Sequence, residues 1–192
     1  ETAGYRYSST VTANDVMTHL PFRQTFDRLY DAETGIFEFP IAVEDEKDPP
    51  MDGRLDAALA LAEKISVYGG LFVVLIHPNV TAEKLGFLRG LTERIRAKAW
   101  WGTLQEFGGW WAARDAVEAD VEAPDGNYRL RLTAPRPVAG LTLELPQGLE
   151  AVGSGGIEPE TRGRFTIIDL PTGSSYFQLR PRAEPAQRPM QP

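Results

Sequence analysis

Apolar positions recur with a helical period in the central part of the chain. Between residues 52 and 68 they are spaced three or four apart, which predicts a helix with one apolar face. The glycine pair 69–70 is typical of a helix end. A second helix is predicted to begin at Thr81 as N-cap. The two apolar stripes consist of Leu55, Ala58, Leu59, Ala62 and Ile65, and of Leu85, Leu88, Leu91 and Ile95.

Residues 71–76 are all apolar and lie between the two predicted helices. A strand that is apolar on both faces is typical of a largely parallel sheet covered by helices. The order helix, strand, helix therefore predicts an α/β fold. His77 follows this strand directly, and Pro78 ends it.

The pattern changes after residue 116 to short alternating segments separated by Pro- and Gly-containing turns. Such segments predict a small antiparallel, all-β sandwich. We therefore expect an α/β domain over residues 1–116, a β-sandwich module over residues 117–183 and a flexible tail over residues 184–192.

Composition excludes several classes of function. The chain of 192 residues has a net charge of −7, which disfavours binding to nucleic-acid phosphates. It contains no cysteine, so disulfides and thiolate chemistry are excluded. No apolar run approaches the roughly 20 residues of a transmembrane helix. The chain starts at Glu1 without a signal-peptide pattern, and we expect it to be a piece of a longer protein.

His77 is the main candidate for chemistry. Functional side chains gather at the carboxyl ends of strands in α/β folds, and histidine can transfer protons near neutral pH. A strand-end histidine can equally be a structural residue hydrogen-bonded to a loop. Spacing alone does not decide between the two roles. The other histidine, His19, has no neighbour at metal-ligand spacing.

Three segments occur in an order that resembles a known family. They are "GYRYSS" near the start, "FEFPIAVEDE" over residues 37–46 and "FVVLIHP" over residues 72–78. Together they resemble the third, fourth and last motifs of the polysaccharide deacetylases (carbohydrate esterase family 4), over residues 1 to about 115. The resemblance implies the C-terminal half of a distorted (β/α) barrel. Tyr7 and Ser8 stand where the family usually has Pro after the Arg.

The resemblance also implies roles for individual residues. His77 would be the general acid that protonates the leaving amine, and Glu38 or Asp45 would orient it, an alternative that the sequence leaves open. Arg6 would pair with the carboxylate that serves as catalytic base. Leu75 would line the pocket for the acetyl methyl group. Apart from the resemblance, His19 and Trp101 are candidates for contact with substrate, and a structural role for His19 or packing of the tryptophan is the alternative.

The first two family motifs, which hold the metal and the base, are absent from this chain. We therefore expect the complete domain to bind a divalent metal such as zinc through residues upstream of Glu1, and this chain alone to bind none and to be inactive. Expected partners are the missing N-terminal half and a polysaccharide of N-acetylated amino sugars, in a bacterial, extracytoplasmic setting.

Two rival functions are considered. The first is a non-catalytic polysaccharide-binding or scaffold protein with a degenerate deacetylase fold. The second is a serine hydrolase using His77, which we rank low because no Gly-x-Ser-x-Gly elbow is present.

Overall fold

A computed structural model describes residues 3–11, 20–27, 30–79, 81–123 and 126–182. The chain divides into two compact units, residues 1–108 and 109–192, which are described separately below. The division falls inside helix α3 (Leu104–Asp115), earlier than the predicted division after residue 116. The reason is that Ala113 belongs to the core of the C-terminal unit, whereas Phe107 stacks edge-on against Phe39 of the N-terminal unit.

The strands of the N-terminal unit are β1 (Tyr7–Ser8), β2 (Phe22–Asp27), β3 (Tyr30–Glu38), β4 (Ile41–Glu44) and β5 (Val73–Leu75). Strands β2 and β3 are antiparallel, whereas β1 runs parallel to β3, and β4 runs parallel to β5. Backbone bonds from Phe39 to Ser8 and from Ile41 to Val11 continue the parallel pairing from β3 into β4. The carboxyl ends of β4 and β5 therefore lie at the same edge.

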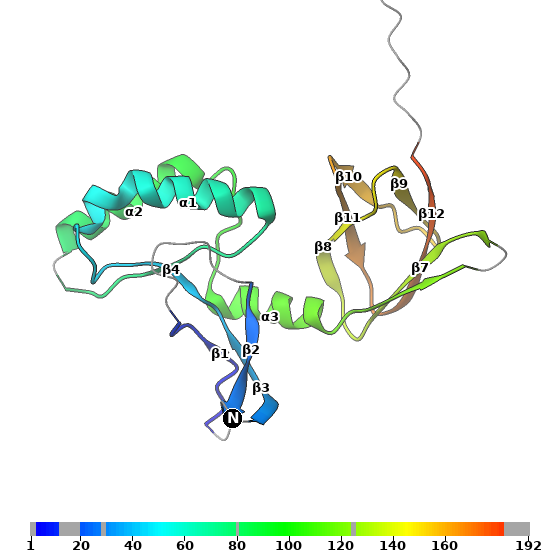
Figure 1. The fold of residues 1–192 in the computed structure, drawn as a ribbon, viewed down its shortest axis with the longest axis horizontal. Coiled ribbons are helices and arrows are strands. Elements are labelled where there is room, and N and C mark those ends of the chain that lie inside the picture. Colours follow the sequence, from blue (N-terminus) through cyan, green and yellow to red (C-terminus); the bar gives the residue numbers. More distant parts are fainter. Residues whose placement is uncertain (1–2, 12–19, 28–29, 80, 124–125, 183–192) are drawn as a thin grey trace, which may run out of the picture. The chain divides into compact units, whose positions relative to one another are not determined.

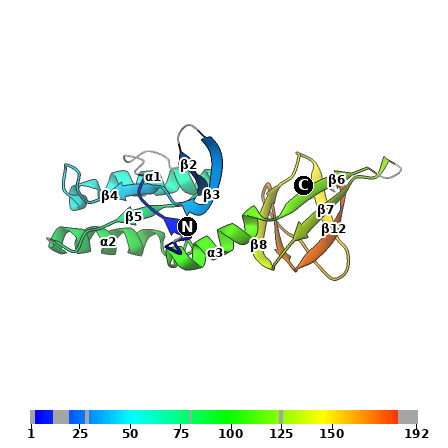
Figure 2. The same ribbon diagram turned by 90° about the horizontal axis from the view of Figure 1, so that it is seen from below.

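The 3₁₀ turn η1 (Met51–Arg54) leads into helix α1 (Leu55–Tyr68), and helix α2 (Thr81–Ile95) follows β5. Both predicted helices are confirmed, and Gly69 after α1 has a positive φ of 72°. The two helices lie on one face of the β4–β5 pair (Figures 1 and 2). Their shared core consists of Ala42, Val43, Met51, Ala58, Leu61, Ile65, Phe87 and Leu91.

Two details of the prediction were wrong. The strand is shorter than residues 71–76, and its residues are half-buried rather than fully covered. The described helices lie on one face of the β4–β5 pair, and among the described strands β5 pairs only with β4. In α2, Leu85 is exposed, and the buried stripe is formed by Lys84, Phe87 and Leu91.

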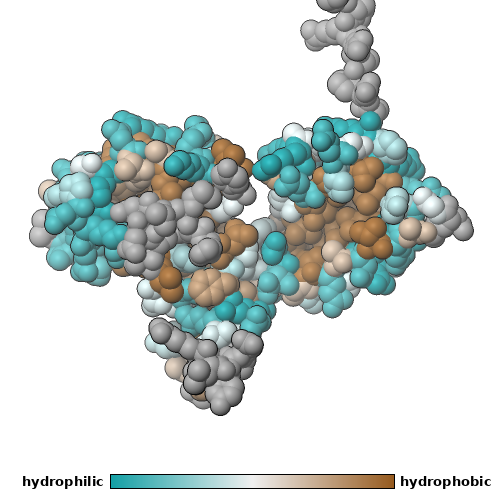
Figure 3. Space-filling model, in the orientation of Figure 1, coloured by the Kyte–Doolittle hydropathy of each residue, from teal (hydrophilic) through white to brown (hydrophobic). Residues whose placement is uncertain are grey.

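In the C-terminal unit, the described residues form the strands β6 (Glu118–Glu122), β7 (Arg129–Ala134), β8 (Val138–Glu144), β9 (Leu149–Gly153), β10 (Glu160–Arg162), β11 (Phe165–Leu170) and β12 (Gly173–Pro181). They form two antiparallel sheets, in the orders β6-β7-β12-β9 and β10-β11-β8. Buried residues of both sheets, such as Leu132, Phe177 and Ile168, share one core. Figure 3 shows that apolar side chains also reach the surface of this unit. Val121 and Tyr176 are among its exposed large side chains.

The fold class is thus α/β, with several sheets and no closed barrel among the described residues. No helix in the described part of the chain is long and apolar enough to cross a membrane.

Candidate functional site

Parallel pairing brings Asp45 and His77 together. Glu44, the last residue of β4, is in register with Leu75, the last residue of β5, so the residues that follow emerge at the same edge. Asp45 Oδ1 lies 2.8 Å from His77 Nδ1, and the backbone N–H of His77 donates to Asp45 Oδ2 at 2.8 Å. One carboxylate therefore fixes both the ring and the backbone of His77.

Lys84, in the first turns of α2, also binds this carboxylate. Its Nζ lies 2.5 Å from Asp45 Oδ2, and it donates to the carbonyl oxygen of His77 at 3.1 Å and to Asn79 Oδ1 at 2.6 Å. The side chain of Asp45 is fully buried and that of Lys84 is 8% exposed. The three donors of the ammonium group thus have three acceptors, as a buried cation requires.

These contacts determine the charge of both groups at neutral pH. Burial alone would raise the pKa of Asp45, but hydrogen bonds from Lys84 and His77 outweigh it and hold the pKa well below its ordinary value. The hydrogen bond to Asp45 raises the pKa of His77 above 6.5, and the charges of Asp45 and Glu46 act in the same direction. Burial and the charge of Lys84 oppose this rise.

The geometry assigns different roles to the two ring nitrogens of His77. Because Asp45 is ionised, Nδ1 carries a proton and donates a hydrogen bond to the carboxylate. The side chain is 42% exposed, so Nε2 remains the nitrogen that can exchange a proton with a ligand or with solvent. An imidazole held in this way by a carboxylate is suited to general acid–base chemistry.

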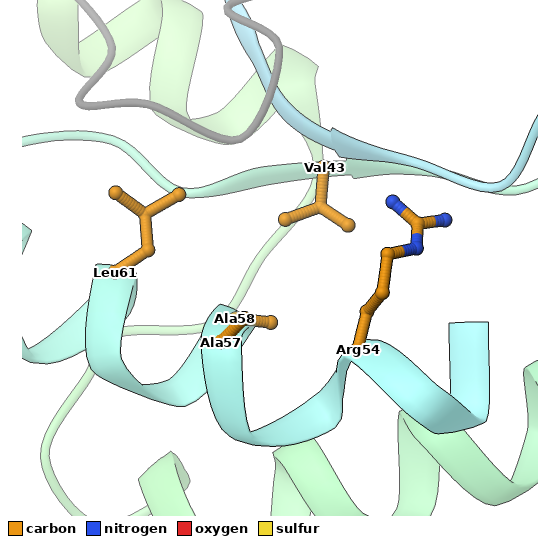
Figure 4. A pocket seen from close by; sticks show the side chains of 5 residues that line it. All are labelled: Val43, Arg54, Ala57, Ala58 and Leu61. Atoms are coloured by element: carbon orange, nitrogen blue, oxygen red, sulfur yellow. The ribbon is translucent and has the colours of Figure 1, made fainter. Parts of the chain in front are cut away.

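Arg54 holds the loop that carries Asp45. Its Nε donates to the carbonyl oxygen of Pro49 at 2.8 Å, and its Nη2 donates to the carbonyl oxygen of Glu44 at 2.7 Å. Figure 4 shows that Arg54 extends from the turn before α1 toward the strand that carries Val43, at a small cavity of about 60 Å³. This cavity is too small for a sugar ring, so we assign Arg54 a structural role.

Glu38 lies in a different environment from Asp45. It is fully buried at the end of β3, where its carboxylate accepts hydrogen bonds from the backbone N–H groups of Thr10 at 2.6 Å and Val11 at 2.9 Å, and from Gln24 at 2.7 Å. Burial alone would raise the pKa of Glu38, but these hydrogen bonds lower it. Of the two carboxylates that the sequence left open, Asp45 is the one that contacts His77.

We expect the substitution Glu38→Ala to lower the free energy of unfolding by about 2–4 kcal/mol, because two backbone N–H groups and an amide lose their acceptor. Urea denaturation measures the loss. The matched control is Glu33→Ala on the same strand, whose exposed side chain should change stability by less than about 0.5 kcal/mol. A Glu38 variant with unchanged stability would contradict this structural role.

The other predicted site residues that the structure describes lie at different places in the N-terminal unit. Arg6 is exposed just before β1 and contributes its carbonyl oxygen to the pairing with Phe37. Trp101 is 46% exposed between α2 and α3. Within the described residues, neither has a hydrogen bond, ion pair or ring contact with His77. Leu75 is half-buried at the end of β5. His19 lies outside the described residues.

The described residues contain no group of three or more His, Asp or Glu side chains arranged to hold an ion. At the Asp45–His77 pair, both carboxylate oxygens already accept hydrogen bonds from His77, and one of them also contacts the ammonium group of Lys84.

Sequence reasoning missed Lys84 and Arg54, and for Lys84 a signal was present. Lys84 precedes Phe87 by three residues and Leu91 by seven, so it shares their helical face. A charged residue on a buried helical face requires a partner of opposite charge. No family model, curated protein or solved structure matches the chain in the comparisons made with known proteins.

Proposed function

We propose that this chain supplies the proton-donating part of a metal-dependent polysaccharide N-deacetylase. The single observation that carries the proposal is the Asp45–His77 pair at the carboxyl ends of two adjacent parallel strands. The ordered resemblance of residues 1 to about 115 to the polysaccharide deacetylases supports it. The N-terminal unit would form the C-terminal half of a distorted (β/α) barrel, and the C-terminal unit a β-sandwich module.

His77 would act on the leaving group. Hydrolysis of an N-acetyl group adds water to the carbonyl carbon and breaks the C–N bond, and the amine nitrogen that leaves must gain a proton. The imidazolium form of His77 can give that proton from Nε2, and the carboxylate of Asp45 stabilises the imidazolium without taking the proton itself. The raised pKa of His77 keeps this donor protonated near neutral pH.

The remaining predicted roles belong to the same proposal. Leu75 would contact the acetyl methyl group, and Arg6 would pair with the carboxylate of the catalytic base. The resemblance assigns the metal and that base to motifs that come before the Arg6 motif in the family. We therefore propose that this chain supplies only the proton donor. The proposed extracytoplasmic setting follows from the substrate class.

A specific observation favours a second candidate, non-catalytic binding of polysaccharide. Trp100 is 63% exposed, and its indole ring lies against Gly102, where a Cβ atom would come within 2.0 Å of the ring. Phe107 contacts the same indole, with ring centroids 6.0 Å apart. An exposed indole held in this way can stack on the C–H face of a pyranose.

Acetate release tests the proposal. The longest natural polypeptide that contains this chain is incubated with partly N-acetylated glucosamine oligomers, and free acetate is measured alongside binding of the oligomers. We expect release of acetate and an equal amount of free amine. Binding without release, in the presence of added divalent metal, would contradict deacetylation and favour the second candidate.

A further inference from the structure

We propose that Lys84 is a positioning residue for the proton-donating histidine: it holds the carboxylate of Asp45 and the turn after β5 in place, and its charge limits how tightly His77 keeps its proton. The inference rests on the proposed role of His77. Lys84 touches neither a substrate nor a reacting atom, so it acts through Asp45.

The contacts of Lys84 account for the positioning. Its ammonium group joins Asp45, at the end of β4, to the carbonyl oxygen of His77 and to the side chain of Asn79, on the turn after β5. Lys84 thus contacts both the loop after β4 and the turn after β5. The separation of these two segments sets the distance between Asp45 and His77. Helix α2 anchors the lysine, because Phe87 and Leu91 on the same face are buried.

The charges around His77 account for the second effect. In the described part of the chain, Asp45 and Glu46 come from the loop after β4, at 2.8 and 3.6 Å from Nδ1, and Lys84 comes from α2. Two carboxylates without a cation would favour the imidazolium form strongly, and a donor that holds its proton too tightly transfers it poorly. The buried ammonium group offsets part of that charge.

Nuclear magnetic resonance of the 192-residue chain tests the effect of the Lys84 charge on His77. The chain has two histidines, and the substitution His77→Gln identifies the ring signal of His77. The pH titration of this signal is compared between the wild type, Lys84→Met and Lys84→Arg. The control Lys64→Met removes an exposed lysine from α1.

In Lys84→Met the pKa of His77 is expected to shift upward, because Asp45 and Glu46 remain and the opposing cation is gone. Lys84→Arg, which keeps the charge, and Lys64→Met should both leave it near the wild-type value. A pKa that is unchanged or lowered in Lys84→Met would overturn the inference.

A second measurement on the wild type needs no folded variant. The ammonium protons of Lys84 should exchange slowly enough with water to give a lysine side-chain ¹⁵N signal at neutral pH, whereas those of exposed Lys64 should not. Absence of a protected lysine signal would overturn the inference. Neither readout depends on acetate release, so failure of the proposed function and failure of this inference can be told apart.

Discussion

The substitution His77→Gln is expected to reduce kcat for acetate release by about 10²–10⁴-fold, the usual effect of losing a general acid. Glutamine keeps much of the side-chain volume and can donate a hydrogen bond to Asp45, but it has no proton to give to the leaving amine. The measurement is the initial rate of acetate release in the longest natural polypeptide containing this chain, with thermal unfolding recorded to show that the variant is folded.

The pH profile separates proton donation from a structural effect. A general acid must be protonated, so kcat/KM of the wild type should fall as the pH rises through the pKa of His77, which the hydrogen bond to Asp45 raises above 6.5. That descending limb should disappear in His77→Gln. Near-wild-type activity of a folded His77→Gln protein would remove His77 from the mechanism.

The two helices around His77 could be predicted because they depend on local pattern. The three- and four-residue spacing in 52–68 and the glycine pair after it are readable within one or two helical turns. Helix α1 begins at Leu55, after the 3₁₀ turn η1, and α2 begins with Thr81, one residue earlier than an N-cap at Thr81 would place it. The short strands of the C-terminal unit were readable for the same reason, since alternation and turn residues are local signals.

The arrangement of the site could not be predicted because it depends on pairing between distant segments. Whether Glu38 or Asp45 meets His77 is set by the register of β4 on β5, which places Glu44 opposite Leu75. A shift of one residue would turn every side chain to the other face. Likewise, the burial of residues 71–76 depends on which segments cover the strand, and this cannot be predicted from their apolar character.

Lys84 shows how choosing apolar residues alone can overlook a buried charged residue. The apolar stripe of α2 was assigned by choosing apolar residues alone, which selected Leu85 and passed over its charged neighbour. In the structure Leu85 is exposed and Lys84 is buried against Asp45. The same carboxylate contacts both Lys84 on α2 and the ring of His77, so the two side chains are coupled through Asp45.

That coupling predicts a large loss of stability in Asp45→Ala. Removing one partner of a buried ion pair leaves the other charge uncompensated, which typically costs about 3–5 kcal/mol in the free energy of unfolding. Here the ammonium group of Lys84 and the backbone N–H of His77 would both lose their acceptor. Urea denaturation at neutral pH measures the effect, and Glu46→Ala, whose side chain is 68% exposed, is the matched control with little expected change.

The pH dependence of the free energy of unfolding shows whether ionised Asp45 stabilises the folded chain. The pKa of Asp45 is depressed in the folded chain, so its contribution is complete above its unfolded value of about 3.8 and is lost as the pH falls below that value toward the folded pKa. The loss in Asp45→Ala should therefore be largest at neutral pH and shrink in acid.

The double variant Asp45→Ala/Lys84→Met should recover part of the lost stability, because neither charge is then left unpaired. Strictly additive losses in the double variant would show that the two side chains are not coupled in the folded chain.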